Sequence, residues 1–176
     1  MSQTKVITGK VRFSYVHAFQ PSSMEEGGKE KYSTCLLIPK KDKKTLEKVS
    51  KAIDAALEEG KKSKFGGKTP PNLKTPLRDG DEERPDDPSF EGMMFVNANS
   101  DRKPGIVDAD VEPILDQSEF YSGCYGRASV TFYPFSVSGN KGIACGLNNL
   151  QKLEDGERLA GGPSAEEDFG ADDDLM

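Results

Sequence analysis

The sequence predicts a mainly β protein with one packed α-helix, built as a small barrel with long loops and an acidic, disordered C-terminal tail. The 176 residues include 18 glycines and 11 prolines, which favours many turns over a helix bundle. About five segments have the alternating or densely apolar pattern of β-strands. One segment, residues 42–59, has the spacing of an amphipathic helix.

The composition of the chain changes near residue 154. Residues 1–153 hold enough apolar side chains for a core, and we expect one domain over this range. Residues 154–176 are acidic, contain glycine and have almost nothing to bury, so we expect a disordered interaction tail. The tail residues expected to bind partner proteins are Asp168, Phe169, Asp172, Asp173, Asp174 and Leu175.

The net charge of −6 conceals a strong asymmetry along the chain. Residues 154–176 hold nine acids and one base, and residues 75–120 hold 13 acids and four bases. Residues 29–74 instead hold 13 lysines and six acids, a net charge of +7. A basic surface is therefore available for a polyanion, although the chain as a whole is acidic.

The cysteine, histidine and N-terminal patterns argue against several classes of protein. Cys35, Cys124 and Cys145 lie far apart inside apolar segments, without the spacing of a zinc ribbon, so we interpret them as buried thiols. His17 is the sole histidine and has no supporting motif. We therefore expect no metal, no cofactor and no enzyme activity. Without a membrane-length apolar run or a signal-peptide core, the sequence indicates a cytoplasmic protein.

The first predicted strand spans residues 5–16, with a bend at Gly9. Its alternation predicts a buried face made of Ile7, Gly9, Val11, Phe13 and Tyr15. The outer face then holds Thr8, Lys10, Arg12 and Ser14. Residues 31–39 are densely apolar and end at Pro39, so we expect a second, central strand there.

The predicted helix begins at the capping residue Asp42 and ends at Gly60. Its apolar stripe, which should pack on the sheet, is Leu46, Val49, Ile53, Ala56 and Leu57. Residues 60–92 read as a long irregular loop. Its first part is basic and contains Phe65, which suits a flap over nucleic acid; a surface excursion without a role is the alternative.

A third strand is predicted over residues 93–100, followed by a turn that places Arg102 and Lys103 at its tip. Residues 106–111 resume an extended pattern, and residues 113–121 predict a helical turn.

Two strands joined by a turn at residues 138–142 are predicted over residues 121–153. On the first of them, Cys124, Gly126, Ala128, Val130 and Phe132 share a small apolar face. The opposite face holds Tyr125, Arg127, Ser129, Thr131 and Tyr133. Aromatic rings beside a cation on an exposed sheet face are typical of surfaces that stack bases and hold phosphates, whereas covering a second layer is the structural alternative.

Five strands and one packed helix fit a five-stranded barrel of the oligonucleotide-binding (OB) kind. The predicted helix follows the second strand, whereas the common arrangement places it after the third, and a sandwich with one helix is the rival fold. The candidate nucleic-acid-binding residues are Lys10, Arg12, Lys31, Tyr32, Arg102, Lys103, Tyr125, Arg127 and Tyr133.

Three segments resemble the phage single-stranded-DNA-binding proteins with an OB-fold, a family formerly described only as a domain of unknown function. They are KVITGKVRFSYVHAFQP, KYSTCLLIPK with its lysine-rich helix, and FYSGCYGRASVTFYPFSVSGNKGIACGLNNLQKLEDGERL. The resemblance covers residues 5–160. It implies sequence-independent binding of single strands during phage DNA replication or recombination, in the cytoplasm of an infected bacterium. It also implies a tail that contacts replication or recombination proteins and competes with DNA.

Two other function classes fit parts of the sequence. A protein–protein interaction or adaptor module would use the aromatic face against another protein and would not bind nucleic acid. A hydrolase could use the carboxylates of residues 79–116 with Mg²⁺, although a proline-rich loop is a poor support for metal ligands. The preference for DNA over RNA and the oligomeric state stay open, and a homodimer is one of the states that the sequence allows.

Overall fold

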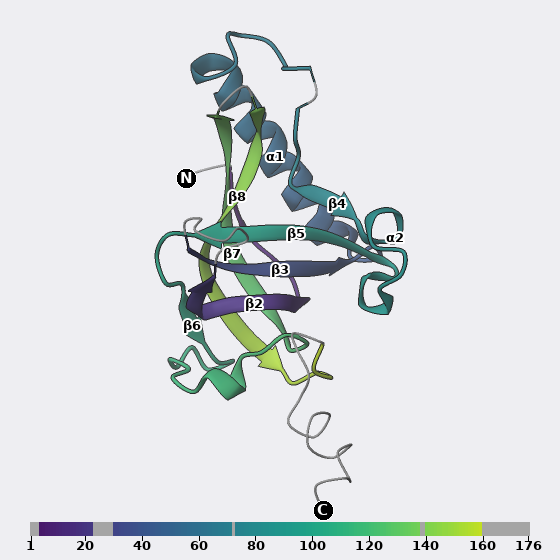
Figure 1. Cartoon of the computed structure of the whole chain (residues 1–176), viewed down its shortest axis with the longest axis vertical. Helices are drawn as coiled ribbons and strands as arrows, with labels where there is room; N and C mark the ends of the chain where they lie inside the picture. Colours follow the sequence, from purple (N-terminus) through teal and green to yellow (C-terminus); the bar gives the residue numbers. More distant parts are fainter. Residues whose placement is uncertain (1–3, 23–29, 72, 138–139, 160–176) are drawn as a thin grey trace, which may run out of the picture.

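The structure is a computed structural model that describes residues 4–22, 30–71, 73–137 and 140–159. Six strands build its barrel: β1 (Lys5–Ile7), β2 (Val11–Ser22), β3 (Lys31–Pro39), β5 (Met93–Ser100), β7 (Tyr125–Val137) and β8 (Asn140–Glu154). In Figure 1, β2, β3 and β5 cross the long β7–β8 hairpin, and the upper part of this hairpin runs beside the helix α1 (Lys43–Ser63).

Hydrogen bonding between the strands closes the barrel. β2 pairs with β3, β3 pairs with β5, and β5 meets β8 in parallel at Asn99 and Gly146. β8 pairs with β7, and the other edge of β7 pairs with both β1 and β2. Because β1 and β2 act as two halves of one bent strand, the barrel has five strands, and the predicted fold class is confirmed. The helix follows the second barrel strand, as the sequence indicates.

The first strand is bent more sharply than predicted, and this changes which side chains are buried. The chain leaves the sheet after Ile7, which is 47% exposed, while Thr8 is buried. The Thr8 hydroxyl accepts a hydrogen bond from the Ala128 amide, 3.0 Å, and donates to the Gly9 carbonyl. The prediction that Ile7 is buried and that Thr8 faces outward was therefore wrong. The break at Gly9 shifts the alternation of inward and outward side chains by one residue.

A second irregularity reverses the expected faces at the middle of β2. The register between β2 and β3 shifts between Ser14 and His17, and Tyr15 has a φ of +48°. Ser14 is consequently buried and Tyr15 is 46% exposed, the opposite of the prediction. Val11 and Phe13 are buried as predicted.

The helix α1 begins as predicted but continues beyond Gly60. The Asp42 carboxylate accepts hydrogen bonds from the amide and the hydroxyl of Thr45 and so caps the first turn. Gly60 does not end the helix, which runs to Ser63. The absence of a side chain at Gly60 instead leaves room for the Phe65 ring and Pro134 to pack against the helix. Within the described part of the chain, no helix is both long enough and apolar enough to span a membrane.

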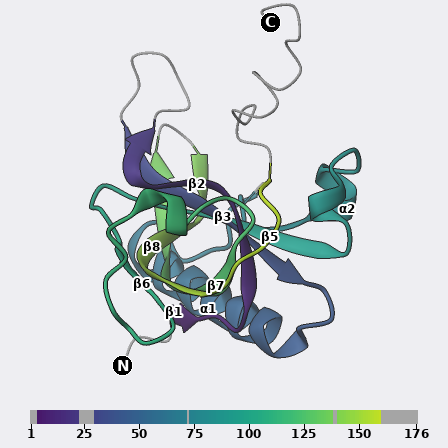
Figure 2. The ribbon, with the colours of Figure 1, turned by 90° about the horizontal axis from the view of Figure 1, so that it is seen from below.

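The segment after α1 packs against the barrel and is not a free flap. Phe65 is only 5% exposed and belongs to the main core, so the prediction that it could lie over nucleic acid was wrong. The chain then forms β4 (Leu77–Asp79), which pairs with β5, the short helix α2 (Gly80–Glu83), and a 3₁₀ turn, η1 (Pro88–Phe90). Figure 2 shows α2 projecting to one side of the barrel.

A lysine holds the base of this projection to the barrel. The Lys40 ammonium lies 2.8 Å from the Asp79 carboxylate and 2.7 Å from that of Asp81. Its hydrogen bonds lower the pKa of both carboxyls, and those hydrogen bonds raise the pKa of Lys40 in turn. All three groups are solvent-accessible, so this ion pair fixes the position of the segment more than it adds to stability.

Three shorter predictions concern the connections. Pairing of β7 with β8 includes Val137 and Asn140, so residues 140–142 of the predicted turn belong to β8, and residues 138–139 lie outside the described ranges. Residues 105–107 form β6 (Gly105–Val107), where an extended segment was expected over residues 106–111; it ends earlier and Val111 has a φ of +64°. The helical turn predicted within residues 113–121 is η2 (Gln117–Glu119).

The barrel interior is the main core. Its largest fully buried side chains include Phe13, Phe120 and Phe132, and the Phe13 and Phe120 ring centroids are 5.0 Å apart. Cys124 and Cys145 are free thiols in this core. Leu36 and Ile38 of β3 point into it, because alternate side chains of a strand face opposite ways.

A second apolar cluster lies on the outer side of β3 and β5. Its buried members, here called the outer cluster, are Cys35, Leu37, Phe90 and Phe95. Met93 and Leu159 pack against it. The ring of Phe90, carried by η1, meets the ring of Phe95 edge-on at 5.1 Å. Burial raises the pKa of the Cys35 thiol to about 12.

Replacing Gly60 by alanine should destabilise the protein, although the same change usually stabilises a helix interior by about 1 kcal/mol. A Cβ at position 60 would lie 2.8 Å from the Pro134 Cβ and would also overlap the Phe65 ring. Overpacking of this kind costs about 1–3 kcal/mol. Denaturant unfolding of Gly60→Ala should show a net loss, whereas Ser50→Ala on the exposed helix face should change stability by less than about 0.5 kcal/mol. An increase in stability for Gly60→Ala would contradict the packing described.

Truncating Leu159 should make Cys35 more reactive. Cys35 is 2% exposed, and the raised pKa of its thiol leaves almost no thiolate at pH 8, so alkylation of the folded wild type should be very slow. Leu159→Ala removes part of the cover of the outer cluster and should accelerate labelling of Cys35 several-fold. Peptide mapping by mass spectrometry separates Cys35 from Cys145, whose unchanged rate is the internal control. Equal acceleration at both thiols would indicate global loosening instead.

Candidate nucleic-acid interface

The face assignment of β7 is confirmed by burial. Gly126, Ala128, Val130 and Phe132 are buried, and Cys124 just before the strand is also buried. The outward side chains are Tyr125, Arg127, Ser129, Thr131 and Tyr133. The register shift between Tyr125 and Gly126 does not exchange the two faces. Aromatic and cationic groups therefore stand on the outside of the barrel, where a ligand can reach them.

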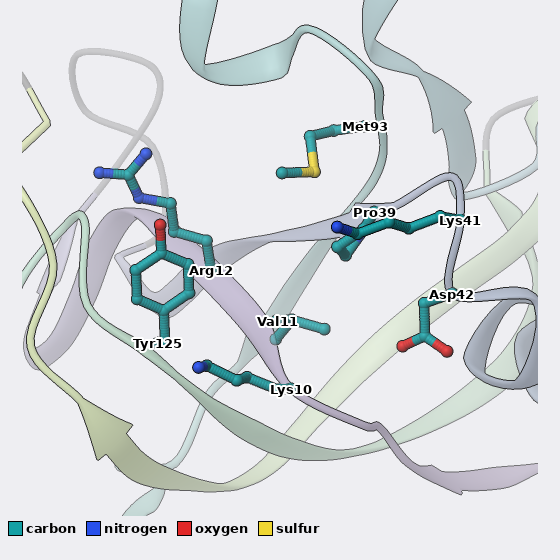
Figure 3. A pocket seen from close by; sticks show the side chains of 8 residues that line it. All are labelled: Lys10, Val11, Arg12, Pro39, Lys41, Asp42, Met93 and Tyr125. Carbon is teal, nitrogen blue, oxygen red and sulfur yellow. The ribbon is translucent and has the colours of Figure 1, made fainter.

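Three of the predicted residues meet at one place. Pairing of β2 with β7 sets Arg12 opposite Tyr125. The Lys10 ammonium and the Arg12 guanidinium each lie 5.3 Å from the centre of the Tyr125 ring. Figure 3 shows the ring between the two cationic side chains. A cation at this distance from an aromatic face is attracted by its quadrupole, so the ring and the two charges hold one another in place.

These residues form one side of a hollow of about 310 Å³, here called the Tyr125 pocket. Its lining is Lys10, Val11, Arg12, Pro39, Lys41, Asp42, Met93 and Tyr125. Met93 faces Arg12 and Tyr125 across the hollow, and Pro39 and Lys41 lie on its far side (Figure 3). The pocket lies where the end of β3, the start of β5 and the start of β7 come together beside β2.

The sequence did not single out Lys41, Met93 or Pro39 as site residues. Their place follows from register, since Arg12 pairs with Leu37 and Pro39 pairs with Met93. The one available signal is the run of lysines directly after Pro39, which marks a cationic strand end.

The Arg12 guanidinium also ties the C-terminal part of the chain to the barrel. Its Nε donates to the Gly123 carbonyl at 3.1 Å, and its Nη2 donates to the Glu157 carbonyl at 2.7 Å. Residues 155–159, here called the strap, therefore run close to the Tyr125 pocket. At its outer end the Leu159 amide donates to the Ser122 carbonyl at 2.9 Å.

Tyr121 is the second anchor of the strap. Its hydroxyl lies 2.9 Å from the Asp155 carboxylate and accepts from the Gly156 amide at 3.1 Å. Lys152 reaches the same carboxylate at 2.6 Å, and the Arg158 guanidinium lies 4.5 Å from the Tyr121 ring centre. The hydrogen bond from Lys152, followed by that from Tyr121, lowers the pKa of Asp155, while burial raises the pKa of Tyr121.

A second group of predicted residues lies at the other end of β3. Tyr32 pairs with Ser100, and the Ser100 hydroxyl accepts a hydrogen bond from the Arg102 amide. The Lys103 ammonium lies 5.2 Å from the centre of the Phe19 ring, a residue that was not among the predicted contacts. Lys31 starts β3 beside this group. By alternation Tyr32 shares the side of Leu36 and Ile38, which face the main core, and its side chain is half-buried.

Tyr133 and Arg127 occupy two further places on β7. Tyr133 is 41% exposed and packs beside Gly146 of β8. Burial of the rest of its ring raises its pKa. Arg127 is exposed and donates from Nε to the Thr8 carbonyl at 3.0 Å, near the break between β1 and β2.

The predicted residues thus form two main groups rather than one row. Tyr32 and Pro39 are seven residues apart on β3, which corresponds to about 23 Å along an extended strand. The predicted tail residues 168–175 lie outside the described ranges. Within those ranges, no group of three histidine, cysteine, aspartate or glutamate side chains could hold a metal ion.

Comparison with known proteins places this geometry in a family. A protein named p50 of the Acyrthosiphon pisum secondary endosymbiont phage 1 is 31% identical over 168 residues, which cover 90% of this chain and 88% of that protein. The single-stranded DNA-binding protein of bacteriophage Enc34, solved in complex with ssDNA, has a TM-score of 0.74 at 29% identity, covering 89% of this chain and 90% of its own.

A more distant structure shares the fold alone. The single-stranded DNA-binding protein gp2.5 of bacteriophage T7 has a TM-score of 0.63 at 13% identity, covering 94% of this chain and 93% of its own.

The model of the family described as Enterobacter phage Enc34, ssDNA-binding protein matches residues 4–176, nearly the whole sequence. The chain therefore belongs to the Enc34 ssDNA-binding protein family.

Proposed function

We propose that this protein binds single-stranded DNA without sequence preference and acts in phage DNA replication or recombination. The observation that carries the proposal is the meeting of Lys10, Arg12 and Tyr125 around an apolar hollow on the outside of the barrel. The Enc34 protein, which shares this fold and family, was solved in complex with ssDNA. The protein is a binding protein and not an enzyme, and its place of action is the cytoplasm of the infected cell.

Phosphates and bases are held by different residues in this proposal. The cations proposed to attract the phosphate chain are Lys10, Arg12, Lys31, Arg102, Lys103 and Arg127. The rings proposed to stack bases are Tyr125, Tyr133 and Tyr32, each worth about 1–3 kcal/mol. Stacking requires exposed base faces, which a duplex does not offer, so single strands are preferred.

The acidic tail is the regulatory part of the proposal. Residues 1–153 form the DNA-binding domain, and residues 154–176 form the interaction tail. The tail starts at the strap, which Arg12 holds beside the Tyr125 pocket, so its acids are tethered close to the proposed phosphate contacts. It competes with DNA for these cations, and once displaced it recruits a replication or recombination protein through residues 168–175.

Tyrosine fluorescence should be quenched as oligothymidine is added, and the affinity should fall as salt rises. On single strands the logarithm of the binding constant falls by about 0.7 per phosphate neutralised for each tenfold rise in salt. Lys10→Gln should lower this slope by roughly 0.7. Lys51→Gln, on the exposed face of α1 and paired with Glu47, makes the same charge change and should leave the slope almost unaltered. Absence of binding at low salt would overturn the proposal and favour a protein-interaction module.

Truncation after Leu159 should tighten oligothymidine binding at low salt. The change removes six acids and keeps the strap and its contacts with the barrel. Replacing residues 160–176 by an uncharged glycine–serine segment of equal length is the matched control and should have the same effect. If neither variant differs from wild type at about 20 mM salt, where screening is weakest, the tail does not compete with DNA.

A further inference from the structure

The Tyr125 pocket differs chemically between its walls and its rim. Val11, Pro39, Met93 and the Tyr125 ring supply apolar surface. Lys10, Arg12 and Lys41 supply three positive charges at the edges, and Asp42 is engaged in capping α1. A nucleotide unit has the matching division, since its base has apolar faces and its flanking phosphates are anionic.

The size of the hollow suits a single base. Its volume of about 310 Å³ lies at the lower end of the range for small-molecule sites. Bases stacked in a duplex cannot enter such a hollow, whereas a base on a single strand can be turned out at little cost.

One charged group of the pocket is already occupied by an acid from the same chain. The Lys10 ammonium lies 2.6 Å from the Glu154 carboxylate, and the two side chains are 47% and 58% exposed. Glu154 is the last residue of β8 and pairs with Tyr125, so this carboxylate is held at the rim of the pocket. A carboxylate on a lysine stands where a phosphate oxygen would bind.

We propose that the Tyr125 pocket takes one unstacked base of single-stranded DNA, and that a neighbouring phosphate replaces the Glu154 carboxylate on Lys10. The base lies between the Tyr125 ring and the Met93 side chain, with Arg12 and Lys41 toward the adjacent phosphates. Glu154 is an internal competitor for this one subsite, distinct from the acids of residues 160–176. The proposal rests on the single-stranded DNA binding proposed above and assigns one nucleotide subsite within it.

A double-mutant cycle tests the exchange at Lys10. Glu154→Gln should tighten oligothymidine binding about two- to fivefold at low salt, because an exposed ion pair no longer has to be broken. Lys10→Gln should weaken binding. In the Lys10→Gln background, Glu154→Gln should raise the affinity for oligothymidine only by the small amount expected from removing any one negative charge. An equal gain in both backgrounds would overturn the exchange.

Asp155→Asn is the matched control for the cycle. It removes one acid from the adjacent position, but the lysine partner of Asp155 is Lys152, which does not line the pocket. Its effect on affinity should be clearly smaller than that of Glu154→Gln and should not depend on Lys10. Equal effects of the two changes would mean that only net charge matters.

Abasic oligonucleotides test whether the pocket holds a base. Wild type should bind oligothymidine more tightly than an abasic chain of equal length, since the abasic chain offers phosphates alone. Met93→Trp fills the hollow and keeps the three cations. It should lower the ratio of the affinity for oligothymidine to the affinity for the abasic chain by about fivefold or more. Met94→Trp, one residue along on the other side of β5, is the matched control and should keep the ratio. An unchanged ratio in Met93→Trp would place the bases elsewhere.

Photocrosslinking of the unmodified protein gives an answer that does not depend on any variant folding. Oligothymidine carrying 5-iododeoxyuridine should crosslink to Tyr125 or Met93, as mapped by mass spectrometry. Crosslinks confined to Phe19, Tyr32 or Tyr133 would overturn the pocket while leaving single-stranded DNA binding intact. Failure of the wild type to bind oligothymidine at low salt would instead overturn the proposed function itself.

Discussion

Pairing of β7 on both of its edges is the constraint on which the rest of the molecule depends. One edge pairs with β8 over nearly its whole length, and the other pairs with β1 and β2. A strand fixed on both sides cannot slip by one residue without exchanging its faces. This double pairing keeps Val130 and Phe132 in the barrel and Tyr125 and Tyr133 outside it. It also sets Tyr125 beside Arg12, from which both the pocket and the anchoring of the strap follow.

Much of this arrangement could be predicted from the sequence because it depends on local patterns. Alternation gave the correct faces of β7, apolar density identified β3, and Asp42 marked the start of α1. The errors fall where a tertiary contact overrides the local pattern. Thr8 turns inward because its hydroxyl bonds the Ala128 amide. Gly60 lies inside a helix because the Phe65 ring needs the space that a side chain would take.

The candidate site shows the same division between local and long-range information. Lys10, Arg12 and Tyr125 could be proposed from strand alternation, but nothing in the sequence says that they meet Met93 and Lys41 at one hollow. That meeting depends on registers between strands far apart in the chain. The role of the strap could not be predicted either, since Glu157 acts through its carbonyl, a group every residue has. The DNA contacts of individual residues and the properties of residues 160–176 stay predictions.

The contact between Leu159 and the outer cluster gives the strap a structural role that its charged sequence does not indicate. Leu159 packs against a cluster that contains the fully buried Phe90, while Tyr121 and Arg12 bind the strap backbone on the way. Besides the contacts of the Asp155 carboxylate with Tyr121 and Lys152, this acidic segment is thereby held by one apolar side chain and by backbone carbonyl and amide hydrogen bonds. The apolar and backbone part of this attachment should consequently be less sensitive to salt than the contacts made through carboxylates.

The separation of the two aromatic and basic groups along β3 has a consequence for valency. If both groups bind DNA as proposed, a very short oligonucleotide would contact the group at Tyr125 or the group at Tyr32, because they lie about 23 Å apart along β3. Once a strand is long enough to bridge them, the second contact becomes intramolecular and proceeds at a high effective concentration. Under the proposed contacts, affinity would then rise in a step at the chain length that first spans both groups.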